Sequence, residues 1–158
     1  MRDAWDVIGR RWVDLTRERF ETGTAPDGTT WKPSARAKRD SGQTLVDTRR
    51  LQDSITHEPD DRGVTIGTNT IYAAIHQFGG TIVPKAKKAL RFFIPGAGWI
   101  TTRKVTMPPR PFLGANGGDL EEFAEILASR LRRTVAVGAV YGGGGGGGND
   151  QAPEGGSA

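Results

Sequence analysis

The chain has 158 residues, no cysteine, only two histidines and a net charge of +4 at pH 7. Without cysteine it has no disulfide, thiolate zinc site or cysteine nucleophile, and two histidines exclude an all-histidine metal cage. No stretch reaches the roughly 18 to 20 apolar residues of a membrane span, and the first residues lack the apolar segment of a signal peptide, so we expect a soluble intracellular protein.

The first predicted element is a helix over residues 3–20. Asp3 is placed to cap its N-terminus. Two tryptophans on one helical face bury a large area, so this face must dock, either in the core or against another subunit. The apolar side chains recur at spacings of three or four residues and therefore share one face: Trp5, Ile8, Trp12 and Leu15.

A turn and two helical patterns follow. Residues 26–28, Pro-Asp-Gly, have the composition of a turn, and we expect Trp31 to anchor this loop to the core. Ser34 can cap a short helix over residues 35–39. A second helical pattern covers residues 45–55.

The middle of the chain predicts short strands. Residues 56–58 and 64–67 flank a turn and form a hairpin pattern. A short helix over residues 71–78, capped by Thr70, follows. Prolines and glycines separate three further β-prone segments: residues 81–83, 90–94 and 99–106.

Prolines rule out regular structure in residues 108–114, and we expect an extended segment there. A helix over residues 119–133 follows, with Asp119 and Glu122 in the pattern of a capping box. We expect a strand over residues 134–141. The predicted domains are a single domain over residues 1–141 and a Gly-rich flexible tail over residues 142–158.

Charge is distributed unevenly along the chain. Residues 62–118 hold eight Lys or Arg and no Asp or Glu. Such a one-sign segment attracts phosphates or an acidic protein surface, or else forms a solvated basic face. The candidate contacts with DNA or an acidic partner are Lys85, Lys87, Lys88, Arg91, Arg103, Lys104 and Arg110.

The sequence contains no recognisable catalytic set. His76 could act as a general base, but no nucleophile or orienting acid lies near it in sequence, so a structural role is favoured. The same interpretation applies to His57. The glycine run over residues 142–148 lacks the Gly-Lys-Ser/Thr of a phosphate loop. We therefore predict no enzymatic activity, no cofactor and no metal.

Four motifs follow one another along the chain. They comprise Phe20 with residues 26–33, residues 45–55, residues 64–67 with 72–80, and residues 109–114 before a C-terminal helix. Together, over about residues 3–134, they resemble the phage virion morphogenesis family, the tail-completion proteins of tailed bacteriophages. Arg49 stands where the family pattern has a glycine, and residues 142–158 lie outside the resemblance.

The resemblance implies an α+β fold, with a small, mostly antiparallel sheet packed with an N-terminal and a C-terminal helix. It also implies a structural virion protein that completes the tail and joins it to the head connector at the neck. Related neck proteins form rings, commonly of six subunits. The implied partners are further copies of the chain, the connector or adaptor, tail-terminator or tail-tube proteins and DNA in the channel, without a membrane. The particle would be assembled in the host cytoplasm.

A closed ring needs two different surfaces on each subunit. The tryptophan helix and the proline-rich segment are the candidates, and the predicted interface residues are Trp5, Trp12, Pro109, Pro111 and Phe112.

Three alternatives remain open. The protein could be a tail-tube terminator or a head-side adaptor. It could be an accessory protein that binds nucleic acid without sequence preference, with Trp99 or Phe92 stacking on bases. A lysis or nuclease enzyme that uses His76 is the weakest alternative.

Overall fold

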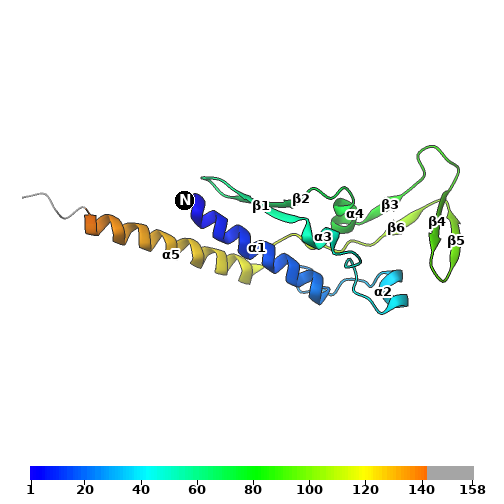
Figure 1. Cartoon of the computed structure of the whole chain (residues 1–158), viewed down its shortest axis with the longest axis horizontal. Helices are drawn as coiled ribbons and strands as arrows, with labels where there is room; N and C mark the ends of the chain where they lie inside the picture. The colour runs from blue at the N-terminus through cyan, green and yellow to red at the C-terminus, as the bar shows by residue number, and fades with distance from the viewer. Residues whose placement is uncertain (142–158) are drawn as a thin grey trace, which may run out of the picture.

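Two long helices lie side by side and run antiparallel in the structure, a computed structural model that describes residues 1–141 (Figure 1). They are α1 (Arg2–Thr22) and α5 (Gly117–Tyr141). The predicted N-terminal helix is confirmed, but the predicted Asp3 cap is wrong, because Met1 occupies the N-cap and no side chain caps this end. The helix ends at Gly23, whose φ of +69° suits glycine.

Helix α5 is longer than the sequence pattern indicates. Its capping box lies one turn before the predicted one: Asn116 Oδ1 accepts the amide of Asp119, and Asp119 Oδ2 accepts the amide of Asn116, both at 2.9 Å. Glu122 pairs instead with Arg11 across the two helices, at 2.7 Å. The predicted strand over residues 134–141 is wrong, because the helix continues through these residues.

The predicted β-hairpin is confirmed, and the structure shows that it packs on α1. Strand β1 (Ile55–Pro59) pairs with β2 (Val64–Thr68) in an antiparallel register that places Ile55 opposite Thr68. Asp60 closes the turn, because its Oδ1 accepts the amides of Arg62 and Gly63 at 2.7 Å. At the other end of β1, Ile55 is 1% exposed and belongs to the same core cluster as Val13 of α1.

The segment between α1 and β1 contains two short helices. Helix α2 (Ala35–Asp40) begins as predicted, with Ser34 Oγ accepting the amide of Ala37 at 3.0 Å. The expected helix over residues 45–55 is wrong, since only α3 (Arg50–Asp53) is helical. Two left-handed residues interrupt the pattern: Leu45 with a φ of +65° and Arg49 with a φ of +59°.

The remaining elements extend away from the helices (Figure 1). Helix α4 (Ala73–Phe78) has Tyr72 at its N-cap, so the predicted Thr70 side-chain cap is wrong. Strand β3 (Gly80–Ile82) pairs with β6 (Val105–Met107), and β4 (Leu90–Ile94) pairs with β5 (Gly98–Thr102), all antiparallel. The predicted strand over residues 99–106 is divided in two. Together these elements confirm the α+β class.

Aromatic residues form the centre of the core. Phe20 and Phe112 are fully buried, with ring centroids 5.2 Å apart, and Phe20 also meets Trp31 edge-on at 5.6 Å. Trp31 is 4% exposed, which confirms its predicted role as a loop anchor. No helix within residues 1–141 is both long and apolar enough to cross a bilayer. The predicted flexible tail, residues 142–158, lies outside the described residues.

Candidate functional site: proline-rich segment and basic arm

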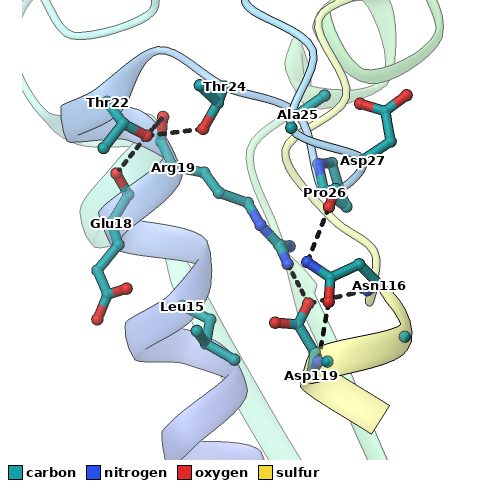
Figure 2. A pocket seen from close by; sticks show the side chains of 13 residues that line it. Leu15, Glu18, Arg19, Thr22, Thr24, Ala25, Pro26, Asp27, Asn116 and Asp119 are labelled. Atoms are coloured by element: carbon teal, nitrogen blue, oxygen red, sulfur yellow. Dashed lines mark hydrogen bonds and ion pairs between the residues drawn. The ribbon is translucent and has the colours of Figure 1, made fainter.

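A hollow of about 540 Å³ lies between the end of α1, the loop after it and the start of α5 (Figure 2). Its central groups bond to one another. Arg19 Nη2 lies 2.5 Å from Asp119 Oδ2, and Asn116 Nδ2 donates to the Pro26 carbonyl at 3.0 Å. At its edge, the amide of Thr29 bonds to Asp27 and lowers the pKa of that carboxyl. These bonds hold the loop against α5 and provide no nucleophile with an adjacent base.

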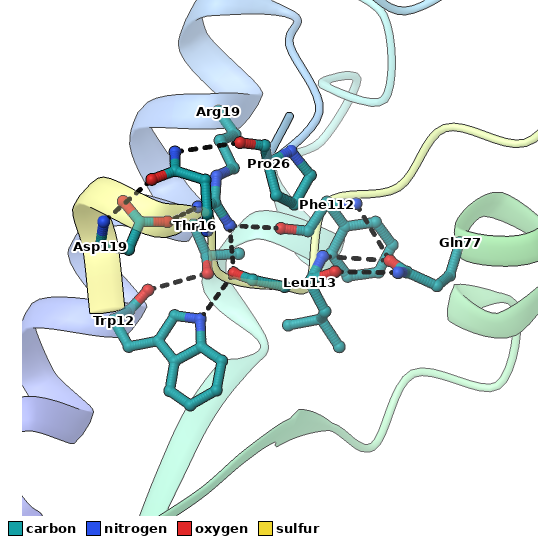
Figure 3. Close-up of polar contacts among 10 residues, drawn as sticks. Trp12, Thr16, Arg19, Pro26, Gln77, Phe112, Leu113 and Asp119 are labelled. Carbon is teal, nitrogen blue, oxygen red and sulfur yellow. Dashed lines mark hydrogen bonds and ion pairs between the residues drawn. The ribbon is translucent and has the colours of Figure 1, made fainter. Parts of the chain in front are cut away.

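The proline-rich segment, residues 108–114, is held on one side by α4 (Figure 3). Gln77 Oε1 accepts the amides of Phe112 and Leu113, both at 3.0 Å. Gln77 Nε2 donates to the carbonyl of Leu113 at 3.0 Å. One side chain therefore satisfies three backbone groups of a segment that forms no regular secondary structure.

Helix α1 holds the same segment from the other side. Arg19 Nη1 donates to the carbonyls of Gly114 at 2.6 Å and Phe112 at 3.3 Å. Trp12 Nε1 donates to the Gly114 carbonyl at 2.8 Å, and its ring packs on Phe123. Because Phe112 is 0% exposed, this residue belongs to the core, and its prediction as a subunit contact is wrong for the described fold.

Arg110 is also interior. It is 4% exposed, its Nε donates to the Lys32 carbonyl at 2.8 Å and its amide donates to the His76 carbonyl at 2.7 Å. Burial lowers the pKa of its guanidinium. The prediction that Arg110 contacts DNA is corrected, because its side chain is not available at the surface.

The other predicted interface residues have mixed exposure. Trp5 and Trp12 on α1 are half-buried, as is Pro111, whose carbonyl accepts a bond from Trp31 Nε1 at 2.8 Å. Pro109 is exposed. A subunit contact through Trp5 or Pro109 therefore stays a prediction.

The two histidines occupy structural positions. His57 Nε2 lies 2.9 Å from Asp6 Oδ1, and this bond is the main cause of the lowered pKa of Asp6. His76 is half-buried, and burial followed by the charge of Arg110 lowers its pKa. Neither histidine bonds to a hydroxyl nucleophile in the described residues. Among residues 1–141, no group of three His, Cys, Asp or Glu is placed to hold a metal.

A group of exposed basic residues without acidic neighbours in sequence lies on what we name the basic arm, residues 80–107, which comprises β3 to β6. Arg91 lies over the ring of Trp99 at 4.7 Å, within cation–π distance. Trp99 also meets Phe93 edge-on at 5.6 Å. Six of the seven predicted contact residues are exposed here: Lys85, Lys87, Lys88, Arg91, Arg103 and Lys104.

Comparison with known proteins decides the family. The pattern of the phage virion morphogenesis family matches residues 1–132. The chain belongs to the phage virion morphogenesis family. It is also 43% identical over 96 residues to the Mu-like prophage FluMu G protein 2 of Haemophilus influenzae. That match covers 61% of the chain and 53% of the relative, so the chain spans about half the length of this relative. No solved structure matches the chain significantly.

Family membership gives the protein a role in phage virion morphogenesis and agrees with the resemblance carried by the four motifs. Within the matched region, residues of these motifs stabilise the fold. Trp31, Gln77 and Phe112 hold the proline-rich segment inside the fold. For this member of the phage virion morphogenesis family, six exposed basic residues and the exposed rings of Phe93 and Trp99 lie together on the basic arm.

Sequence reasoning missed Phe93 and Gln77. The signal for Phe93 was available: apolar residues occupy consecutive positions of the predicted β-prone segment 90–94, so its two faces both carry apolar side chains. Gln77 gave no such signal, because its three bonds reach a segment 35 and 36 residues away.

Proposed function

We propose that this protein is a structural, non-enzymatic subunit that completes the phage tail and joins it to the head connector at the neck, as part of a ring. Family membership supports a part in building the virion. The observation that carries the finer proposal is the contrast between the interior and the arm. The buried charges of the hollow, Arg19 and Asp119, pair with each other, whereas six basic residues on the arm are exposed and available to a partner.

The basic arm would face DNA in the channel or an acidic ring of an adjoining virion protein. No Asp or Glu within residues 62–118 offsets its charge. If all six exposed basic side chains met phosphates, the slope of log affinity against log salt would be about −5. An acidic protein surface would be attracted by the same charges and screened by the same salt.

A stop codon early in the gene, followed by electron microscopy of the particles, tests the proposal. DNA-filled heads beside separate tails would support joining at the neck. Tails of abnormal length beside normal heads would favour the tail-tube terminator. Normal, infectious particles would refute a required role in the virion.

Complementation of this mutant phage then tests the arm. We expect the variant Lys85→Glu/Lys87→Glu/Lys88→Glu to fold normally and to reduce infectivity. Its control reverses three exposed charges elsewhere, at Lys38, Arg62 and Arg130, and should complement. Full complementation by the arm variant would contradict a role for these charges.

A second candidate function is favoured by the exposed rings. Trp99 is 63% exposed and Phe92 is 36% exposed, beside basic side chains, which is the combination that binds single-stranded nucleic acid. The assay is filter binding of the purified protein at two salt concentrations. Tight binding near physiological salt, lost on Trp99→Ala, would favour the nucleic-acid-binding accessory protein over the neck subunit.

A further inference from the structure

The β4–β5 hairpin presents apolar side chains on both of its faces. The register places Phe92 opposite Ile100 on one face and Phe93 opposite Trp99 on the other. Phe93 is 56% exposed and Trp99 is 63% exposed, and the hairpin makes its main contacts within itself. An isolated two-stranded hairpin is marginally stable in water. We therefore expect another surface to cover an apolar face of this hairpin.

Helix α5 carries an apolar surface of its own on the side away from α1. Phe123 faces α1 and is 8% exposed, whereas a second row of apolar side chains, spaced by four and seven residues, faces outward. We name this row the outer stripe. It consists of Leu120, 57% exposed, the exposed Ala124, Leu131, 44% exposed, and Val135, 72% exposed.

The hairpin and the first half of the outer stripe are complementary in charge. Exposed Glu121 and Glu125 border the first half of the outer stripe. Exposed Lys87, Lys88 and Arg91 border the hairpin, on a segment without any acidic residue. Opposite charges around two apolar patches steer association and disfavour pairing of either patch with itself.

The hairpin lies at one end of the elongated described part of the chain, and α5 runs from its middle to the other end (Figure 1). One copy therefore cannot bring its own hairpin onto its own outer stripe without rearranging the fold. A contact between different surfaces of successive copies is heterologous, and it produces a closed ring if the rotation between copies closes.

We propose that the β4–β5 hairpin of one copy docks on the outer stripe of α5 of the next copy. This inference rests on the ring-forming part of the proposed function and names the two surfaces that meet. The two half-exposed rings of the docking face, Phe93 and Trp99, would bury on the order of 100 Å² each. They would thus supply about a quarter of the roughly 800 Å² per partner in a standard interface.

The natural chain lacks cysteine, so a single introduced cysteine is a unique cross-linking site. Thr101 lies on the Trp99 face of the hairpin and is exposed, and Ala124 lies on the outer stripe. We expect a mixture of Thr101→Cys and Ala124→Cys proteins, treated with a short bismaleimide, to give covalent dimers. Neither protein alone should do so.

The matched control pairs Thr101→Cys with Asp61→Cys, which places the second thiol on the exposed β1–β2 turn. Dimer yield no higher than in this control would overturn the inference. Dimers of Thr101→Cys alone would also overturn it, because they would show two hairpins meeting.

A charge exchange gives a second readout. We expect Lys87→Glu/Lys88→Glu to reduce dimer yield at least tenfold, and Glu121→Lys/Glu125→Lys in the other component to restore it. Failure of the second pair to restore the yield would overturn the assigned pairing.

The inference and the proposed function fail in different experiments. If light scattering gives the mass of an oligomer but the Thr101–Ala124 cross-link does not form, this contact is refuted and the neck role stands. If the cross-link forms specifically but the stop-codon mutant produces normal phage particles, the neck role is refuted and the contact stands.

Discussion

Replacing Gln77 with alanine would release the proline-rich segment from α4. The change removes three hydrogen bonds of 3.0 Å, to the amides of Phe112 and Leu113 and to the Leu113 carbonyl. At about 0.5–1.5 kcal/mol for each bond, the free energy of unfolding should fall by about 1.5–4.5 kcal/mol. We expect the upper half of this range, because the amide of Phe112 would stay buried without a partner.

The assay is urea unfolding followed by far-ultraviolet circular dichroism at 25 °C. Gln77→Met retains most of the side-chain volume and separates lost bonds from lost packing, so it should cost nearly as much as Gln77→Ala. The control is Gln43→Ala, which removes one exposed bond to the Glu21 carbonyl and should cost below about 1 kcal/mol. A loss below about 1 kcal/mol for Gln77→Ala would refute the reasoning.

Three further predictions concern stability, each read from urea unfolding. Asp119→Ala leaves the buried Arg19 without its carboxylate partner and should lower the free energy of unfolding by about 3–5 kcal/mol. Asp14→Ala removes an exposed ion pair within α1 and should lower it by less than about 1 kcal/mol. Equal losses for the two variants would contradict this. Gly79→Ala should lower the free energy of unfolding by more than about 2 kcal/mol, because the φ of Gly79 is +68° and an added Cβ would lie 2.7 Å from the backbone nitrogen of Pro109. Gly63 has open space around its Cα, so Gly63→Ala should change this free energy by less than about 1 kcal/mol. Burial, then Arg110, lowers the pKa of His76 below 6.5, so the unfolded chain binds its proton first and stability falls as pH decreases through 6.5. His76→Asn should reduce the stability difference between about pH 7.5 and about pH 5, and an unchanged difference would count against this.

Local patterns in the sequence were sufficient for elements whose stabilising contacts are also local. The spacing of Trp5, Ile8 and Trp12 predicted α1, and the turn at Asp60 predicted the β1–β2 hairpin. The same reasoning failed over residues 134–141, where Thr and Val favour a strand. Once the capping box at Asn116 has started α5, each added residue gains one more helical bond, and this outweighs the weak local preference.

Position 49 is a different kind of failure. Arg49 has a left-handed backbone, with a φ of +59°, at the position where the resemblance led us to expect glycine. The departure from the expected glycine put a turn here in doubt, but the left-handed backbone of Arg49 forms one, which interrupts the predicted helix and leaves only α3.

The candidate site could be predicted only in part. Charge along the chain located the basic arm, because charge is a property of composition. The burial of Arg110 and Phe112 could not be foreseen, since it depends on partners far away in sequence. The Nε of Arg110 bonds to the carbonyl of a residue 78 positions earlier, and Trp12 bonds to one 102 positions later.

The pairing of Arg19 with Asp119 has a consequence for synthesis of the protein. The two residues are 100 positions apart, and Phe112 enters the core only with the second half of the chain. At about 5–20 residues per second, the ribosome needs roughly 5–20 s to make that interval. During this time the tryptophan face of α1 has neither α5 nor the proline-rich segment to cover it. Folding is thus completed late in translation, and a chain truncated before Asp119 would be a substrate for chaperones and proteases rather than for assembly.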